Sequence, residues 1–425
     1  MTRVALWKQI LGAIVLAGAV GSLLEPDAGL GAMLLPVLDA VGRLFMNGLK
    51  MLVVPLVMSS VIVGVASAGS GRDVGRMGIR ALGFYVTTTL AAVLIALTLV
   101  NAIAPGRVDG QPAGPQLALT AHTAEVQTQV AGKGLANVVD TLVSIAPPNV
   151  IAAAADGKLL SLIFFSVLFG VFAARIDERY GRPVLDLWNG IFRIMMRMTD
   201  VVMAFAPIGV FALVTQTVVK AGVENAAGPI ARFGVVVLLG LAVHAFLVLP
   251  ALIGAFGRVR PWGIYAGMSP ALLTAFSTAS SASTLPMSLD CLERRLGVSN
   301  RVASFVMPLG TSINHAGSAL YECAGAMFIA QAYGLQLSFA TQFTVVVLAL
   351  VTSMGIASIP AASLVGITII LTAIGLPVEA IGVLFVLDRI LDMLRTSVNV
   401  LADASCRLIV ARLEGEPTAL AERAA

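Results

Sequence analysis

Residues 388–403, DRILDMLRTSVNVLAD, carry polar side chains that could bind a charged ligand and a cation together. At about 100° per residue, five of these side chains fall within an arc of about 80° on one face of a helix. They are Asp388, Asp392, Arg395, Asn399 and Asp403. Acids, a base and an amide on one face predict a ligand and ion site. A structural ion-pair network between helices is the alternative interpretation.

The residue types suggest different roles along this face. Arg395 is a fork of donors suited to a carboxylate, and Asp388 lies where it would orient that fork. Asp392 could bind a substrate ammonium group. Asn399 and Asp403 supply the hard oxygen atoms that a small cation such as Na+ prefers. Each charge near the centre of a span costs about 2.5–3.5 kcal/mol to insert, which favours a functional role.

The rest of the chain has the composition of a membrane protein. Its 425 residues are 58% hydrophobic and 12% charged, whereas about a quarter of the residues of a soluble domain are charged. We therefore expect an all-α polytopic protein of the cell (inner or plasma) membrane, which is not an enzyme. The net charge of +4 comes from arginines in short loops and indicates no nucleic-acid partner. The three cysteines, Cys291, Cys323 and Cys406, are expected to be packing residues.

Six conventional membrane spans are predicted from the apolar runs. They cover about 6–23, 32–68, 79–104, 158–176, 185–217 and 230–256. The second and fifth exceed one bilayer crossing, so we expect them to be tilted or bent. Arginines gather in alternate loops, for example at Arg72, Arg76 and Arg80. By the positive-inside rule, both termini are expected in the cytoplasm.

Two further segments are predicted to be re-entrant helical hairpins. Segment 262–286 is interrupted by STASSASTLP and has basic residues on both flanks, and segment 338–376 has two apolar arms around SMGIASIPAAS. A broken span at about 300–332 follows the first hairpin, and a span at about 378–412 follows the second. The hairpin-plus-span unit thus occurs twice with opposite orientation, which is typical of inverted-repeat secondary transporters.

The motif Thr-Ser-(Ile/Val)-Asn occurs once in each unit, in TSINHAGS (311–318) and in TSVNVLAD (396–403). We expect both copies to mark helix breaks at which Asn314 and Asn399 face a shared site. The hairpin tips should close over a small anion with backbone groups and hydroxyls. These tip residues are Ser280, Ser281, Ile359, Pro360 and Ala361.

These segments resemble the dicarboxylate/amino acid:cation symporter family, which includes the glutamate transporters and archaeal aspartate transporters. KMLVVPLVMSSVIVGVAS (50–67) and APIGVFAL (206–213) are similar to the family's second and fifth spans. PLGTSIN…GSALYE and LDMLRTSVNVLAD are similar to the seventh and eighth spans. The resemblance implies a homotrimer whose protomers have eight spans and two hairpins and work by an elevator-like motion. It implies a scaffold at 1–78 and 105–225 (the latter with an extracellular loop), a transport domain at 79–104 and 226–413, and a cytoplasmic tail at 414–425.

The resemblance also implies roles for single residues. Arg395 matches the arginine that binds the substrate's side-chain carboxylate, and Asp392 matches the aspartate that binds its amino group. The other matched substrate contacts are Thr396, Asn399, Ser281 and Ser318. Asn399 and Asp403 also match one sodium site, for which Asn314 and Gly310, at the break, are further candidate ligands. A further sodium site would use Tyr85, Thr88 and Thr89.

Residues 314–318 depart from the family pattern, because they read Asn-His-Ala-Gly-Ser where the family has Asn-Met-Asp-Gly-Thr. Ala316 removes the carboxylate expected beside Tyr85, Thr88 and Thr89, so we expect coupling to fewer Na+ or partly to H+. Losing one Na+ lowers the attainable accumulation of substrate about 500-fold. His315 either packs between helices or carries a proton. Arg389 is expected to pair with Asp392 at i,i+3 and to replace an arginine that relatives place elsewhere.

The sequence thus predicts a symporter that imports aspartate or glutamate with Na+, and with H+ as a further candidate coupling ion. Its partners would be a small anionic substrate and the lipid bilayer. The alternative substrate is a C4-dicarboxylate such as succinate, malate or fumarate. Two other functions stay open at this point. One is a serine hydrolase dyad of Ser280 or Ser281 with His315, and the other is a channel-like anion conductance.

Overall fold

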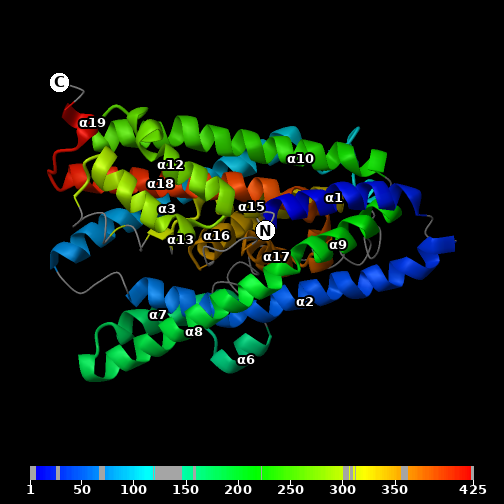
Figure 1. Cartoon of the computed structure of the whole chain (residues 1–425), viewed down its shortest axis with the longest axis horizontal. Helices are drawn as coiled ribbons and strands as arrows, with labels where there is room; N and C mark the ends of the chain where they lie inside the picture. Colours follow the sequence, from blue (N-terminus) through cyan, green and yellow to red (C-terminus); the bar gives the residue numbers. More distant parts are fainter. Residues whose placement is uncertain are drawn as a thin grey trace, which may run out of the picture.

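The computed structural model describes residues 6–24, 29–66, 72–117, 119, 146–156, 159–221, 223–299, 306, 310–311, 313–355 and 362–422. These residues form two groups of helices, which lie beside one another and each pack mainly within themselves (Figure 1). The first group comprises α1 (Leu6–Leu23), α2 (Gly29–Ala66), α7 (Leu159–Ala173), α8 (Glu178–Ala204) and α9 (Ala206–Ala221). The second comprises α3 (Arg72–Ile103), α10 (Val223–Val243), α12 (Gly263–Thr278), α13 (Ser281–Asp290), α15 (Ala316–Ala332), α16 (Phe339–Gly355), α17 (Ala362–Ile374) and α18 (Phe385–Leu413).

Short elements connect these helices. The α-helical ones are α6 (Val150–Ala155), α11 (Leu249–Leu252) and α19 (Ala419–Glu422). Strands β1 (Arg107–Val108) and β2 (Gln111–Pro112) form a small antiparallel hairpin, and η1 (Pro115–Leu117) and η5 (Val378–Leu384) are 3₁₀ turns. Three segments are π-helical, namely η2 (His244–Val248), η3 (Ile253–Gly257) and η4 (Cys291–Arg295).

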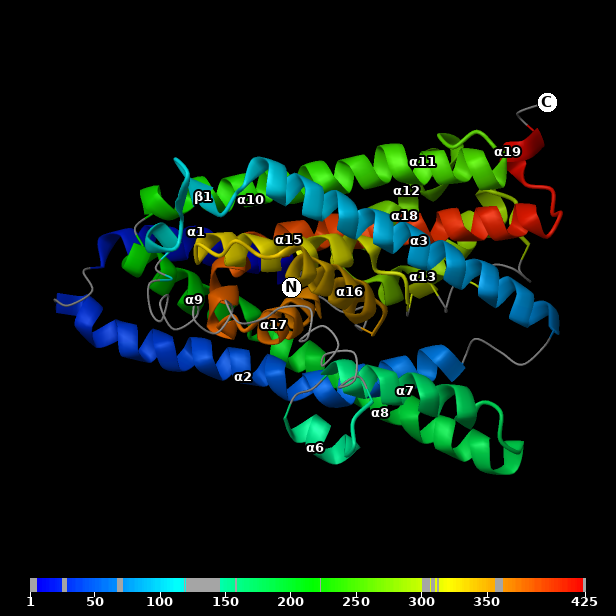
Figure 2. The same cartoon turned by 180° about the vertical axis from the view of Figure 1, so that it is seen from behind.

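Each group has its own packing centre. In the first, α2 packs on α7, α8 and α9, and α1 packs on α9. In the second, α15 contacts α3, α10, α16, α17 and α18, and Figure 2 shows the α16–α17 pair lying beside α15. All residues of α15, from Ala316 to Ala332, are buried. α15 is therefore the centre around which the second group is assembled.

Two stretches among the described residues are long and apolar enough to cross a membrane, Met77–Ile103 and Ala227–Gly257. The count rises to three if Glu178–Val202 and Ala206–Gln216 form one span. That pair is bent by 56°, so the prediction of a bent or tilted fifth span is confirmed. The bounds of the helices lie near those of the predicted spans. For example, α1 covers Leu6–Leu23, and the first predicted span covers 6–23.

The first predicted hairpin is a helix–turn–helix formed by α12 and α13, which pack together. Ala279 ends α12 in the left-handed conformation (φ 49°), and Ser280 is the N-cap of α13, accepting a hydrogen bond from the amide of Ser283 at 3.3 Å. The turn is thus shorter than the serine-rich segment predicted, because the serine hydroxyls cap and begin the second helix. The second arm also continues past residue 286 to Asp290.

The two copies of the repeated motif behave differently. Asn314 and His315 lie outside regular helix directly before α15, so the first predicted break is confirmed. The second predicted break is wrong, because α18 runs without interruption from Phe385 to Leu413. This segment contains no Gly or Pro that would interrupt a helix.

The second predicted hairpin corresponds to α16 and α17, which also pack together. Its predicted tip residues Ile359, Pro360 and Ala361 lie outside the described residues. The three cysteines are all buried and free, as expected for packing residues.

Candidate substrate and ion site

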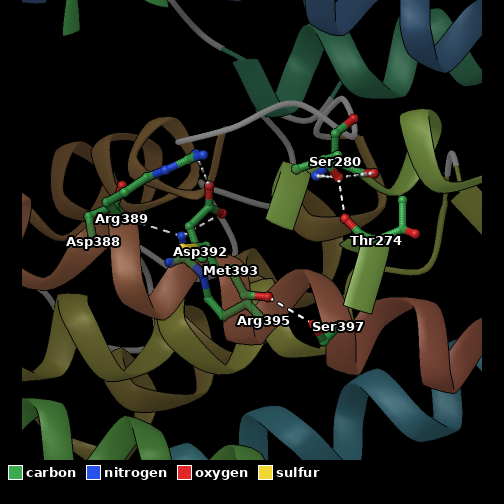
Figure 3. A network of polar contacts seen from close by, with 9 residues as sticks. Thr274, Ser280, Asp388, Arg389, Asp392, Met393, Arg395 and Ser397 are labelled. Atoms are coloured by element: carbon green, nitrogen blue, oxygen red, sulfur yellow. Dashed lines mark hydrogen bonds and ion pairs between the residues drawn. The ribbon is translucent and has the colours of Figure 1, made fainter. Parts of the chain in front are cut away.

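The charged face of α18 is an interconnected and buried cluster (Figure 3). Nη2 of Arg395 donates to Oδ1 of Asp392 at 2.9 Å and to Oδ1 of Asp388 at 3.1 Å. The Arg395 side chain is fully buried, and those of Asp388 and Asp392 are 7% exposed. Because the spacing of i,i+3 and i,i+7 puts these residues above one another on the helix, α18 itself positions the cluster.

The guanidinium of Arg395 also lies over the ring of Tyr321 on α15, 3.8 Å from its centroid. This contact fixes the guanidinium plane and adds a cation–π interaction in a desolvated place. Nε and Nη1 of Arg395 have no hydrogen-bond partner among the described residues. A buried guanidinium with two unused donors is a site that a carboxylate ligand would complete.

Arg389 extends the cluster at its outer end. Its Nη1 lies 3.8 Å from Oδ2 of Asp392, and its side chain is only 8% exposed. The expected i,i+3 pair between Arg389 and Asp392 is therefore present. Asp392 consequently lies between two guanidinium groups, and the four charges of the cluster sum to zero.

The hairpin residues predicted to contact substrate are held at the tip between α12 and α13, and both of these helices pack on α18. Ser280 and Ser281 are 7% and 4% exposed. Thr396, one residue after Arg395, is 5% exposed. Figure 3 shows Ser280 and Thr274 of this hairpin in the same view as the cluster on α18.

A second set of polar groups, which we call the oxygen-rich set, lies where the break before α15 meets α18. Its residues are Asn314, Gly317, Ser318, Asn399 and Asp403. Nδ2 of Asn314 donates to Oδ1 of Asp403 at 2.8 Å, and the amide of Gly317 donates to Oδ1 of Asn399 at 2.8 Å. Nδ2 of Asn399 donates to the hydroxyl of Ser318 at 3.2 Å. Both Oδ2 of Asp403 and Oδ1 of Asn314 are buried without a described partner. Two unpaired hard oxygen atoms in a buried site fit a small cation.

Gly310 shows how close these groups approach the backbone. A Cβ at this position would lie 2.5 Å from the hydroxyl of Tyr85 and 2.7 Å from Oδ1 of Asp403. The structure therefore brings Gly310, Tyr85, Asn314 and Asp403 together. Only glycine leaves room for the carboxylate in this position.

Replacing Gly310 with alanine is expected to raise the Na+ concentration that half-saturates the protein by about 10-fold or more, because the methyl group displaces Asp403. The concentration can be measured as the midpoint of Na+-dependent thermal stabilisation. Gly254→Ala is the matched control, since nothing lies within 4 Å of a Cβ there. Equal midpoints for both variants would contradict this prediction.

The residues predicted for a further sodium site lie on α3, but two of them, Thr88 and Tyr85, have other partners. Thr88 Oγ1 is 3.2 Å from Nε2 of His244, a buried residue that begins the π-helical segment η2. The hydroxyl of Thr89 is buried without a described partner. Tyr85 donates to the carbonyl of Val306 at 3.3 Å. With Ala316 in place of a carboxylate, this set offers a cation no negative charge.

His315 is buried at the break before α15, and its Nδ1 lies 3.0 Å from the carbonyl oxygen of Ser353 on α16. This contact ties the break to the first arm of the second hairpin. Of the two roles predicted for His315, packing between helices and carrying a proton, this contact supports the first.

Glu322 was not predicted as a site residue, and it is fully buried in α15. Its Oε2 lies 2.6 Å from the hydroxyl of Thr352 on α16, while Oε1 has no described partner. Gly366 on α17 leaves room for this carboxyl group, because a Cβ at Gly366 would collide with it. Glu322 is the final residue of the GSALYE motif, and an acidic residue within an otherwise apolar span was a signal that could have found it.

A model of the sodium:dicarboxylate symporter family matches residues 6–413. The chain belongs to this family. The resemblance inferred from the sequence motifs is thereby confirmed, and the chain is a membrane transporter. The charged cluster and the oxygen-rich set described above are thus features of a sodium:dicarboxylate symporter.

Individual members of the family support this assignment, because their similarity extends over nearly the whole chain. A proton/sodium-glutamate symport protein of Bacillus caldotenax is 35% identical over 419 residues, covering 98% of this chain and 96% of the relative. A proton/glutamate-aspartate symporter of Escherichia coli (strain K12) is 34% identical, covering 96% and 92%. Excitatory amino acid transporter 2 of Homo sapiens is 32% identical, covering 92% and 76%.

Proposed function

We propose that this symporter imports an acidic amino acid, aspartate or glutamate, together with Na+ and H+. The observation that carries the proposal is the buried Arg395, which is held by two aspartates and keeps two donors without a described partner. A substrate carboxylate would take these donors, and Asp392 would take the substrate ammonium group. The relatives named as glutamate or glutamate-aspartate symporters support this choice.

A C4-dicarboxylate is the second candidate substrate, and one contact favours it. Arg389 as well as Arg395 faces Asp392. Two guanidinium groups reduce the negative potential that a substrate ammonium group would meet at Asp392. They would also serve a substrate with two carboxylates and no amine.

The residues proposed to close the substrate site are Ser280, Ser281, Ser318, Thr396 and Asn399, with Ile359, Pro360 and Ala361 from the second hairpin. Asp388 and Arg389 would act indirectly, by holding Arg395 and Asp392 in place. The unpaired oxygen atoms of Asn314 and Asp403, with Asn399 and the carbonyl of Gly310, would bind Na+. Tyr85, Thr88 and Thr89 are the proposed residues of a further ion site, which lacks a carboxylate because residue 316 is alanine.

Glu322 is our candidate for the proton-coupling group. A fully buried carboxyl group is stable when it is protonated or paired with a cation, and no described ion pair includes Glu322. Its neighbour Thr352 belongs to a hairpin arm, so gain or loss of a proton would act directly on the packing of α16.

Replacing Glu322 with glutamine should remove uptake driven by a pH gradient and leave Na+-driven uptake within about threefold of wild type, because glutamine mimics the protonated acid. Uptake into proteoliposomes under each gradient alone measures both effects. Glu379→Gln changes an exposed glutamate in η5 and serves as the control. Continued pH-driven uptake by the Glu322 variant would rule out this role.

The two helix groups suggest two domains with different functions. We assign α1, α2 and α7–α9 to a scaffold, and α3, α10, α12, α13 and α15–α18 to a transport domain that carries the site. Eight spans, two re-entrant hairpins, cytoplasmic termini, a homotrimer and an elevator-like motion complete the proposed architecture. The separate packing centres of the two groups support it, because an elevator-like motion would need each group to move as a body.

Uptake of radiolabelled aspartate and succinate by proteoliposomes tests the function. Na+ and H+ gradients are imposed separately, with liposomes lacking the protein as the control. We expect aspartate to accumulate under either gradient. Accumulation of succinate alone would select the second candidate, and uptake of neither compound would contradict the proposed function.

A further inference from the structure

Arg407 is a buried charge that no role described so far requires. It lies on α18 one turn beyond Asp403, and its side chain is fully buried. Its Nη2 donates to the carbonyl of Val306 at 3.3 Å, which is the carbonyl that also accepts from Tyr85 at 3.3 Å. Arg407 therefore shares a backbone contact with one of the residues of the further sodium site.

The donors of Arg407 are only partly used. Its Nε and Nη1 have no hydrogen-bond partner within the described part of the chain. A guanidinium group stays charged in proteins, so burying it needs a negative group close by. An arginine that satisfies one carbonyl and leaves two donors unused is not explained as a packing residue.

Asp403 is the acid that meets this requirement. It precedes Arg407 by four residues, which puts both side chains on one face of α18. Oδ1 of Asp403 accepts from Asn314, while its Oδ2 has no described partner. No ion pair within 4.0 Å joins Arg407 and Asp403 among the pairs of the described residues. Asp403 and Arg407 are therefore close enough in the chain to influence one another but do not form a closed salt bridge.

The residues described on the opposite side of this region, Tyr85, Thr88 and Ala316, carry no carboxylate. On α3, Tyr85 faces Val306 and Thr88 faces His244. At the start of α15, Ala316 has no carboxylate. Asp403 is thus the acid shared by the oxygen-rich set and by Arg407, and one carboxylate cannot neutralise both a guanidinium and two sodium ions.

We propose that Arg407 is a tethered cation, which balances Asp403 from within the protein and takes the place of one coupling sodium ion. The inference rests on the proposed function, because it assumes that Asp403 belongs to an ion site. With charges about 6 Å apart and an effective dielectric constant of about 20, Arg407 weakens cation binding at Asp403 by about 100-fold. The transporter would accordingly move fewer sodium ions for each substrate.

Arg407→Gln tests this role, because glutamine keeps a donor for the carbonyl of Val306 and removes the charge. In the purified protein, we expect the Na+ concentration for half-maximal thermal stabilisation to fall by about 10-fold to 100-fold. In proteoliposomes, the charge moved per substrate should rise by about one unit, since a sodium ion takes the place of the guanidinium. Arg407→Lys keeps the charge and should behave as wild type. Arg412→Gln, near the end of the same helix, is the matched control.

The outcomes separate this inference from the proposed function. A folded Arg407→Gln protein with the Na+ midpoint and charge movement of wild type would overturn the tethered-cation role. If Arg407→Gln does not fold, the charge-balanced double variant Asp403→Asn/Arg407→Gln should fold and lose its response to Na+, and its failure to fold would overturn the role as well. The binding measurement needs no substrate, so a wrong substrate assignment would appear only in the uptake experiment.

Discussion

Replacing Arg395 with alanine is expected to reduce substrate uptake by about 100-fold or more, because losing the buried charged partner of the substrate carboxylate costs about 2–5 kcal/mol of binding free energy. The change should also destabilise the folded protein by about 3–5 kcal/mol, because it breaks a buried ion pair. The change leaves Asp388 and Asp392 buried without their shared partner, and it removes the donors proposed for the substrate carboxylate. Initial rates of uptake in proteoliposomes and the thermal unfolding midpoint in detergent measure the two effects.

A surface pair provides the control for Arg395. Arg294 and Asp290 also form an ion pair at 2.9 Å, but their side chains are 82% and 47% exposed. Arg294→Ala should leave uptake and stability nearly unchanged, since exposed pairs contribute about 0–1 kcal/mol. Adding Asp388→Asn to the Arg395 variant should restore part of the stability and none of the uptake. Restored uptake in that double variant would show that Arg395 only neutralises Asp388.

Replacing Asp392 with asparagine is expected to lower aspartate uptake by about 100-fold and to spare succinate uptake, because the lost charge is the proposed partner of the ammonium group. Asparagine keeps the shape and an acceptor for Arg395, so the cluster itself should persist. Competition of unlabelled aspartate and succinate against each labelled substrate gives the ratio directly.

Asp388→Asn is the matched control for this experiment. Asp388 accepts from the same Nη2 atom of Arg395, at 3.1 Å against 2.9 Å for Asp392. Its replacement should reduce the uptake of both substrates by similar factors. If Asp392→Asn also reduced both equally, Asp392 would hold Arg395 in place and would not distinguish the substrates.

Much of the fold followed from the sequence, because helix length and charge spacing are local properties. The stripe of Asp388, Asp392 and Arg395 appears on one face of α18 as its periodicity predicts, and the bend in the fifth span follows from its length. The break at Asn314 was predicted from its polar motif. The second break was predicted by analogy between the two motifs, and it failed because α18 has nothing in its sequence that interrupts a helix.

The residues that contact the charged groups were harder to predict from the sequence. Tyr321 under Arg395, Thr352 beside Glu322 and Val306 beside Arg407 all lie on other elements. These contacts depend on how helices far apart in the chain pack, and no periodicity encodes them. Glu322 and Arg407 were visible as charges in apolar surroundings, yet their importance depends on buried environments that only tertiary structure reveals.

The uninterrupted and charge-rich α18 has a consequence for biosynthesis. Six of its charged residues are buried: Asp388, Arg389, Asp392, Arg395, Asp403 and Arg407. Taken one by one, they oppose entry of the isolated helix into lipid by about 15 kcal/mol. The helices that α18 packs against, α3, α10, α12, α13 and α15, all precede it in the chain. The helices that contact α18 are therefore already in the membrane when the translocon inserts it. Because its charged residues can then be buried against these helices, the order of synthesis favours the insertion of α18.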